Sequence, residues 1–141
     1  QEFCERLATS PEGGDVVGIH VCWGIYGEWH YWGFIRHDPD TGPAMTRHFR
    51  EWLRAKYETN EALQQAWGTD EFTLDDAPVP GTGERANDHP SLLRKPDTER
   101  RVIDYFQCQH QLVVDDLLHF CQVVKEYWPR PVIVGVFYGV V

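Results

Sequence analysis

Two apolar runs limit what this sequence can fold into more than any other feature. Residues 16–23 read VVGIHVCW, and residues 132–138 read VIVGVFY. Both runs are rich in β-branched residues, and neither alternates apolar with polar side chains. Such runs are typical of strands in a parallel sheet that is covered on both faces. We therefore predict a strand at each run, paired in parallel within an α/β fold.

The segment between the two runs carries helical patterns, which supply the crossover that parallel strands need. Proline at position 43 suits the first turn of a helix, and Gly68 suits the end of one. Apolar residues recur at steps of three and four. These patterns predict helices over residues 43–57, 60–67 and 98–127.

Two strands do not make a stable parallel sheet alone, because their faces and edges need partners. We therefore expect the chain to be an internal piece of a larger domain, or to be completed by another chain such as a second copy. The chain opens on Gln1, so the absence of a leader pattern at this end is uninformative.

Composition excludes several classes of partner. The chain has 22 acidic and 13 basic residues and a formal charge of −9. Nucleic acids and anionic membranes would repel such a protein. No apolar run approaches the roughly 20 residues that cross a bilayer. The cysteines are scattered without a CxxC pair, which favours reduced thiols and a cytoplasmic location over a disulfide framework; they are Cys4, Cys22, Cys108 and Cys121.

Residues 24–33, GIYGEWHYWG, place four aromatic rings around one glutamate, Glu28. The stretch follows the predicted strand 16–23. In parallel α/β folds, sites form at the carboxyl ends of the strands. The stretch is therefore either the wall of a ring-lined pocket with Glu28 as its working group, or packed core that carries an acid. In the second case Glu28 caps the loop or pairs with Arg36.

Residues 43–69, PAMTRHFREWLRAKYETNEALQQAWGT, resemble a segment of glycoside hydrolase family 42, the β-galactosidase-type (β/α)8 barrels. The residues that carry the resemblance are Phe49, Arg50, Trp52, Leu53, Arg54, Lys56, Tyr57, Thr59, Ala62, Leu63, Ala66, Trp67, Gly68 and Thr69. The segments before and after it resemble such barrels more loosely. The resemblance implies that residues 1–141 are a fragment of one TIM-barrel catalytic domain, running roughly from its fourth strand to the start of the next.

One departure from the family concerns the acid/base residue. In the family this glutamate directly follows asparagine at the end of a strand of the form G-x-x-x-x-N-E. When that pattern is laid from Gly18, Trp23 and Gly24 stand in the places of asparagine and glutamate. Glu28 comes four residues later. Either Glu28 has taken the role at a remodelled strand end, or the acid/base function is absent.

Glycosidases use two carboxyl groups, one of which protonates the leaving oxygen. Aromatic rings suit sugars because they stack on the C–H faces of the ring. We expect Glu28 to be the general acid/base and a set of nearby residues to hold the sugar: Trp23, Tyr26, Trp29, His30, Trp32 and Tyr138. The alternative is that these rings are core.

The first functional hypothesis is a retaining, β-galactosidase-like hydrolase whose carbohydrate substrate is held by this pocket. The resemblance places the nucleophile outside this chain, so the isolated chain is expected to be inactive. We expect Asp104 and Glu126 to be solvated helix residues. Residues 37–42, HDPDTG, suit a turn better than a calcium loop, and we expect neither a metal ion nor a cofactor. The second hypothesis is a non-catalytic carbohydrate-binding or scaffold protein on a barrel-derived fold.

Overall fold

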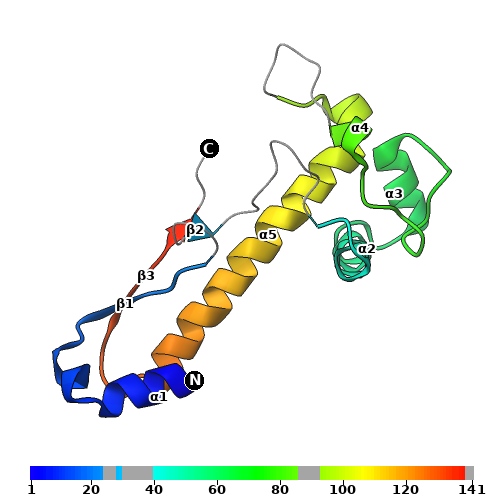
Figure 1. The fold of residues 1–141 in the computed structure, drawn as a ribbon. Helices are drawn as coiled ribbons and strands as arrows, with labels where there is room; N and C mark the ends of the chain where they lie inside the picture. The colour runs from blue at the N-terminus through cyan, green and yellow to red at the C-terminus, as the bar shows by residue number, and fades with distance from the viewer. Residues whose placement is uncertain (24–27, 30–39, 86–92, 139–141) are drawn as a thin grey trace. The chain divides into compact units, whose positions relative to one another are not determined.

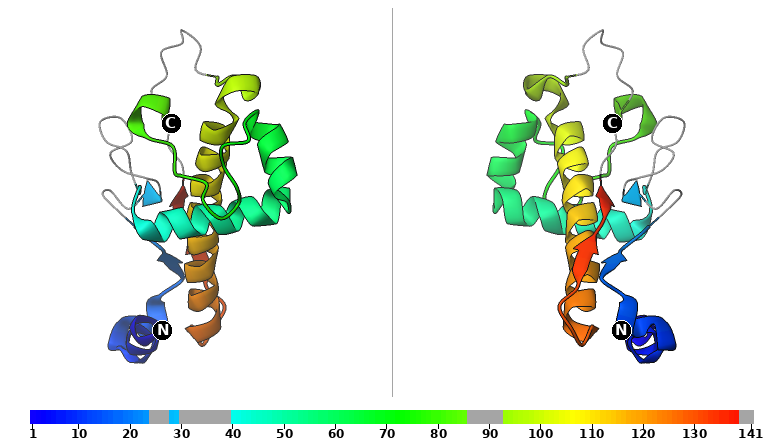
Figure 2. Two further views of the ribbon diagram at one scale, coloured as in Figure 1. Left: turned by 90° about the vertical axis from the view of Figure 1, so that its right-hand side faces the viewer. Right: turned by 90° about the vertical axis from the view of Figure 1, so that its left-hand side faces the viewer.

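The fold is known from a computed structural model that describes residues 1–23, 28–29, 40–85 and 93–138 (Figures 1 and 2). Its elements are α1 Glu2–Thr9, the 3-10 helix η1 Pro11–Asp15, β1 Gly18–His20, β2 Glu28–Trp29, α2 Pro43–Tyr57, α3 Asn60–Trp67, α4 Thr82–Arg85, α5 Pro96–Tyr127, β3 Ile133–Gly135 and β4 Phe137–Tyr138. They form two compact units, residues 1–32 with 110–141 and residues 33–109. Each unit contains part of α5.

The strands pair in parallel, as the apolar runs predict. In the first pair, β1 lies beside β3, with Gly18 opposite Ile133 and His20 opposite Gly135. In the second pair, β2 lies beside β4. The strands are shorter than residues 16–23 and 132–138, and the second run is divided between β3 and β4. The described residues therefore form parallel β–α–β connections, and no closed barrel is seen among them.

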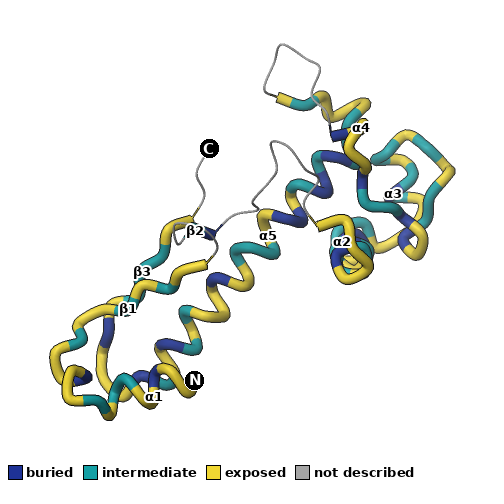
Figure 3. The backbone as a smooth tube through the Cα atoms, in the orientation of Figure 1, coloured by how far each residue is buried: buried dark blue, intermediate teal, exposed yellow. Residues whose placement is uncertain are grey.

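Within the part of the chain that the structure describes, one face of the β1–β3 pair is covered. A buried cluster of Cys4, Val124, Trp128 and Val132 joins α1 and the end of α5 to that face, where Ile19 and Val134 pack against it. On the other face Ile133 is 74% exposed and Phe137 of β4 is 60% exposed. Figure 3, in which the backbone is coloured by burial, shows exposed residues along β1. The described residues supply helices to one side of these strands, and the prediction that both faces are covered stays a prediction for the whole domain.

Helices α2 and α3 have the bounds that the sequence predicts, because local chemistry fixes both ends. Proline occupies the first turn of α2. The Thr59 hydroxyl caps α3 by accepting a hydrogen bond from the Ala62 backbone N–H at 3.2 Å. Gly68 ends α3 in the left-handed conformation, with φ of 68°, and its N–H bonds to the Gln64 carbonyl.

Helix α5 begins at Pro96, two residues before the predicted start. Its first turn is irregular, since Glu99 has φ of −120° and ψ of 21°. The Glu99 carboxylate accepts a hydrogen bond from the Lys95 backbone N–H at 2.7 Å, which caps this turn. Among the helices that the structure describes, none has both the length and the apolar composition to cross a bilayer.

The prediction that Asp104 is solvated is wrong. Its side chain is fully buried in α5 and carries four contacts. The Tyr57 hydroxyl donates to it at 2.6 Å, the Trp67 indole N–H at 2.8 Å and the Lys56 ammonium at 2.8 Å. The Arg100 guanidinium lies 3.2 Å from the same carboxylate. A buried carboxylate needs such partners to offset its lost hydration.

The Asp104 cluster explains why the segment 43–69 has its polar residues. Lys56, Tyr57 and Trp67 all belong to that segment, and all donate to one carboxylate on α5. The apolar centre beside them is Phe49, which is fully buried and meets the Tyr105 ring edge-on at 5.2 Å. These residues of the segment 43–69 therefore form the surface through which α2 and α3 pack against the first half of α5.

The Tyr57 hydroxyl gives this cluster a pH dependence. Burial, and secondly the hydrogen bond to Asp104, raise the pKa of Tyr57 from 10.0 to about 12. The unfolded chain loses this proton near pH 10 and the folded chain near pH 12, so the stabilisation is full below pH 10 and disappears as the pH rises to 12. We expect the free energy of unfolding to fall more steeply across this range than in Tyr57→Phe. Urea titrations at several pH values measure it, and equal slopes would contradict the assignment.

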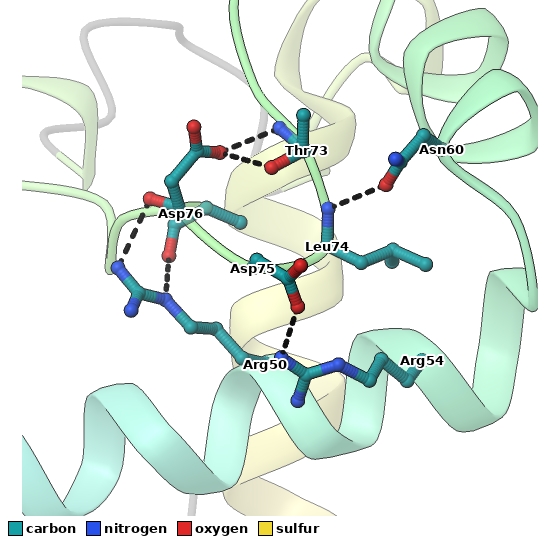
Figure 4. Close-up of polar contacts among 8 residues, drawn as sticks. Arg50, Arg54, Asn60, Thr73, Leu74, Asp75 and Asp76 are labelled. Carbon is teal, nitrogen blue, oxygen red and sulfur yellow. Dashed lines mark hydrogen bonds and ion pairs between the residues drawn. The ribbon is translucent and has the colours of Figure 1, made fainter.

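The segment after α3 is held to α2 by a forked arginine (Figure 4). Arg50 donates from Nε to the Ala77 carbonyl and from Nη2 to the Asp76 carbonyl, both at 3.0 Å. The Asn60 side chain accepts from the Leu74 N–H at 2.9 Å. These bonds bring Leu74 and Ala77 into the core, where they are buried.

Arg50→Lys is expected to lower the free energy of unfolding by about 1 kcal/mol, because an ammonium group cannot reproduce the two-pronged contact. Arg54→Lys is the matched control. Arg54 lies one turn further along α2 and pairs with Asp75 on the surface, so its substitution should change stability by less than about 0.5 kcal/mol. Urea unfolding followed by circular dichroism compares the two. Equal effects would contradict a structural role for the fork.

Candidate active site

Glu28 lies at the carboxyl end of the parallel strands. It occupies β2 and is in register with Phe137 of β4. Phe137 is two residues beyond Gly135, where the β1–β3 ladder ends with a bond from the Val21 N–H to the Gly135 carbonyl at 2.9 Å. Glu28 therefore lies just beyond the carboxyl ends of β1 and β3. This is where parallel α/β proteins form their sites.

The neighbour of Glu28 fixes which face its side chain occupies. Trp29 is 4% exposed, and its indole N–H donates to the Val21 carbonyl at 2.9 Å. Its ring centre lies 5.8 Å from that of Phe120 on α5. Trp29 thus faces the helix. Because side chains alternate along a strand, Glu28 faces away from α5, on the side that Phe137 also occupies.

The face below Glu28 carries an imidazole in a fixed position. The rings of His20 and Phe137 have centres 4.4 Å apart. His20 lies across Gly135, where a Cβ atom would stand 3.3 Å from its Cδ2. Its Nδ1 is 3.0 Å from the Cys22 sulfur. The absence of a side chain at Gly135 therefore leaves the space in which the histidine ring lies.

A cleft of about 500 Å³ opens on the side of Trp29. Its described lining is Cys22, Trp23, Trp29 and Phe120. Trp23 is 50% exposed, and its ring centre lies 5.6 Å from that of Trp29. Phe120 is the lining residue that sequence reasoning missed. The predicted stripe of α5 passes through Leu117 and Val124, which are buried, whereas Phe120 is 48% exposed. Its position outside the apolar stripe of α5 is the sequence signal that indicates a large aromatic ring on the surface of this helix.

The predicted site residues divide into four groups. Glu28 is half-buried and shares a face with Phe137. Trp29 and Tyr138 are in register and share the opposite face, while Trp23 lies at the cleft. The remaining predicted sugar contacts, Tyr26, His30 and Trp32, lie outside the described residues. Arg36, the proposed partner of Glu28 in the alternative interpretation, lies outside them too.

Comparison with known proteins identifies a family. The family model of glycoside hydrolase family 42, described as beta-galactosidase, matches residues 22–134. No curated protein and no solved structure gives a significant match. The matched range takes in Glu28, the segment 43–69, the whole of α5 and the start of β3, so it covers most of the chain. It confirms the resemblance that the segment 43–69 indicates. The chain belongs to glycoside hydrolase family 42, the beta-galactosidase family.

Proposed function

We propose that this chain supplies one wall of the active site of a retaining glycoside hydrolase that acts on β-galactosides, with Glu28 as its general acid/base. Membership of the family implies a glycosidase and a carbohydrate substrate. The observation that carries the assignment to Glu28 is its position. It follows the carboxyl end of two parallel strands, on the face turned away from α5.

The barrel architecture of the family indicates which side of the sheet the face of Glu28 belongs to. In a (β/α)8 barrel the helices form the outer ring, and the strand faces turned away from them line the interior. We infer that β1 and β3 are neighbouring strands of such a barrel. The exposed side chains of Ile133 and Phe137 support this, because they are suited to an interior that further strands would cover. Glu28 would then point into the mouth of the barrel.

The chemistry assigned to Glu28 is proton transfer in both halves of a double displacement. It donates a proton to the glycosidic oxygen as the bond to the sugar breaks, and then takes one from the water that attacks the glycosyl intermediate. The nucleophile is a second carboxylate about 5 Å away. We assign that residue to a part of the barrel outside this chain, and we expect the 141-residue chain alone to be inactive.

The proposed sugar contacts are those that the sequence predicts: Trp23, Tyr26, Trp29, His30, Trp32 and Tyr138. Trp29 and Tyr138 share the face opposite Glu28, and the cleft that Trp23 lines opens on the same side as Trp29. Trp23 has the most open ring of the three, since half of its surface is exposed. Indole faces of this kind stack on the C–H faces of a sugar.

One observation favours a second function, a carbohydrate-binding protein without catalysis. The family's acid/base glutamate directly follows asparagine, and here Trp23 stands in the place of that asparagine. A pocket of this kind could keep its aromatic rings after losing its chemistry. Both functions predict that the protein binds a carbohydrate, and only the first predicts that it hydrolyses one.

The test compares full-length protein with its Glu28→Gln variant in galactose binding by calorimetry and in hydrolysis of an aryl β-galactoside. Glu126→Gln is the matched control, because Glu126 is exposed near the end of α5. Loss of turnover with retained binding, in Glu28→Gln alone, supports the proposal. Equal turnover in all three proteins contradicts the role of Glu28. Binding without turnover in the unmodified protein supports the second function.

A further inference from the structure

We propose that Cys22 and His20 form a nucleophilic thiol–imidazole pair at the carboxyl end of β1, and that Cys22 is a modification site for small disulfides. Neither residue has a part in the glycosidase chemistry proposed above. The proposal depends on the geometry of this pair, on the cleft beside it and on the surroundings of the other cysteines.

The pair has the arrangement of an activated nucleophile. The Cys22 sulfur lies 3.0 Å from Nδ1 of His20, within reach of proton transfer, and both residues are exposed. The imidazole is itself held in place by the Phe137 ring and by the space over Gly135. A nucleophile beside a base, with the base oriented by a third group, is the signature of a reactive side chain.

The cleft gives an incoming disulfide a surface on which to lie. Cys22 lines it together with Trp23, Trp29 and Phe120. Trp23 and Phe120 are each about half exposed, so their rings are open to an apolar or aromatic group. A disulfide that carries such a group would bury it there while one of its sulfur atoms meets Cys22.

The remaining cysteines have surroundings that suppress this reaction. Cys4 and Cys108 are buried. Burial raises the pKa of the Cys108 thiol to about 12, and burial also raises the pKa of Cys121, which is half-buried on α5. The thiolate is the attacking species, so Cys108 and Cys121 are poor nucleophiles in the folded chain, while burial keeps a disulfide away from Cys4. Cys22 is the exposed cysteine.

The reaction is a thiol–disulfide exchange. The Cys22 sulfur attacks one sulfur of the disulfide and forms a new S–S bond, while the original S–S bond breaks. The departing sulfur leaves as a thiolate with the bonding electron pair. The proton of Cys22 passes to Nδ1 of His20, so Cys22 is oxidised and the departing thiol is reduced. Excess small thiol reverses the exchange.

A group bound to Cys22 would occupy the cleft that Trp23, a proposed sugar contact, also lines, and this consequence rests on the proposed function. Modification of Cys22 is therefore expected to hinder entry of a sugar. The thiol chemistry can be measured without any glycosidase activity, so failure of one proposal is distinguishable from failure of the other.

The test is the reaction of folded full-length protein with excess dithiobis(nitrobenzoic acid), followed through the coloured thiolate that it releases. We expect Cys22 to contribute one rapidly reacting thiol per chain. Cys22→Ser should remove this rapid phase, and Cys121→Ser, the matched control, should keep it. His20→Gln should slow the phase about tenfold, less than general bases usually contribute because a thiol is already a good nucleophile. Gly135→Ala should slow it as well, by displacing the imidazole.

Two outcomes would overturn the proposal. A rapid phase that survives in Cys22→Ser would assign the reactive thiol elsewhere. A rapid phase with unchanged rate in both His20→Gln and Gly135→Ala would remove the imidazole from the reaction. Circular dichroism of each variant, and a reaction in urea that exposes every remaining thiol, establish that the variants are folded and that their thiols are intact.

Discussion

Full-length protein with Glu28→Gln is expected to hydrolyse alkyl β-galactosides about 10²–10⁴ times more slowly than the unmodified protein, because general acid–base catalysis contributes factors of that size. Glutamine keeps the shape and the hydrogen-bonding capacity of the side chain, and it cannot deliver a proton to the leaving oxygen. Binding of galactose should change little, since the sugar contacts are other residues. The loss should therefore fall on kcat rather than on KM.

The identity of the leaving group makes this prediction specific. A dinitrophenolate leaves without protonation, so the first step on a dinitrophenyl galactoside should be nearly as fast in Glu28→Gln as in the unmodified protein. The glycosyl intermediate should then accumulate, because no base activates water, and an initial burst of dinitrophenol should appear. Equal losses in the rate of the first step on alkyl and dinitrophenyl substrates would exclude Glu28 as the proton donor. Glu126→Gln should behave like the unmodified protein on both substrates.

Asp104→Ala is expected to destabilise the chain by about 3 kcal/mol, at the lower end of what removal of one partner from a buried ion pair produces. The substitution leaves Lys56 and Arg100 without their carboxylate and leaves Tyr57 and Trp67 without an acceptor. The two cations keep 24% and 33% of their side-chain surface exposed, so water relieves part of the loss. Urea unfolding, followed by circular dichroism, measures the change.

Two further variants separate charge from packing at Asp104. Asp116→Ala, on the exposed side of α5, should change stability by less than about 0.5 kcal/mol. Asp104→Asn keeps a hydrogen-bond acceptor and removes the charge, so its effect should lie between the other two. A loss in Asp104→Ala no larger than in Asp116→Ala would show that the cluster contributes nothing to folding.

The sequence predicts α2 and α3 with their observed bounds because their signals are local. The proline of the first turn, the Thr59 cap and the left-handed Gly68 act within a few residues of each helix end. The parallel strands are predicted by the same reasoning, from runs that lack alternation. Their observed lengths are shorter, because strand ends depend on the partners beside them and not on the run itself.

Asp104 could not be predicted from local pattern, because its partners are distant in the chain. Tyr57 is 47 positions away, Trp67 is 37 and Lys56 is 48. Base rates for aspartate favour the surface, and only the folded packing of α2 and α3 on α5 overrides them. The segment 43–69 contains the donors of this cluster, Lys56, Tyr57 and Trp67, but its sequence does not identify the acceptor.

The candidate site was partly predictable for a similar reason. Chain order alone places Glu28 at the carboxyl end of a strand. The face that it occupies depends on the anchoring of Trp29 by the Val21 carbonyl and Phe120, which the sequence does not reveal. Phe120 itself was missed because it lies outside the apolar stripe of its helix.

The face of β1 and β3 that the described residues leave exposed has a consequence for how the protein is made. Ile133 and Phe137 present large apolar surfaces beside short parallel strands, and such surfaces promote association while a chain is still on the ribosome. Parallel pairing between distant segments is also slow to form. Synthesis of this region is therefore expected to depend on chaperones, and yield in a foreign host should improve when translation is slowed or chaperones are co-expressed.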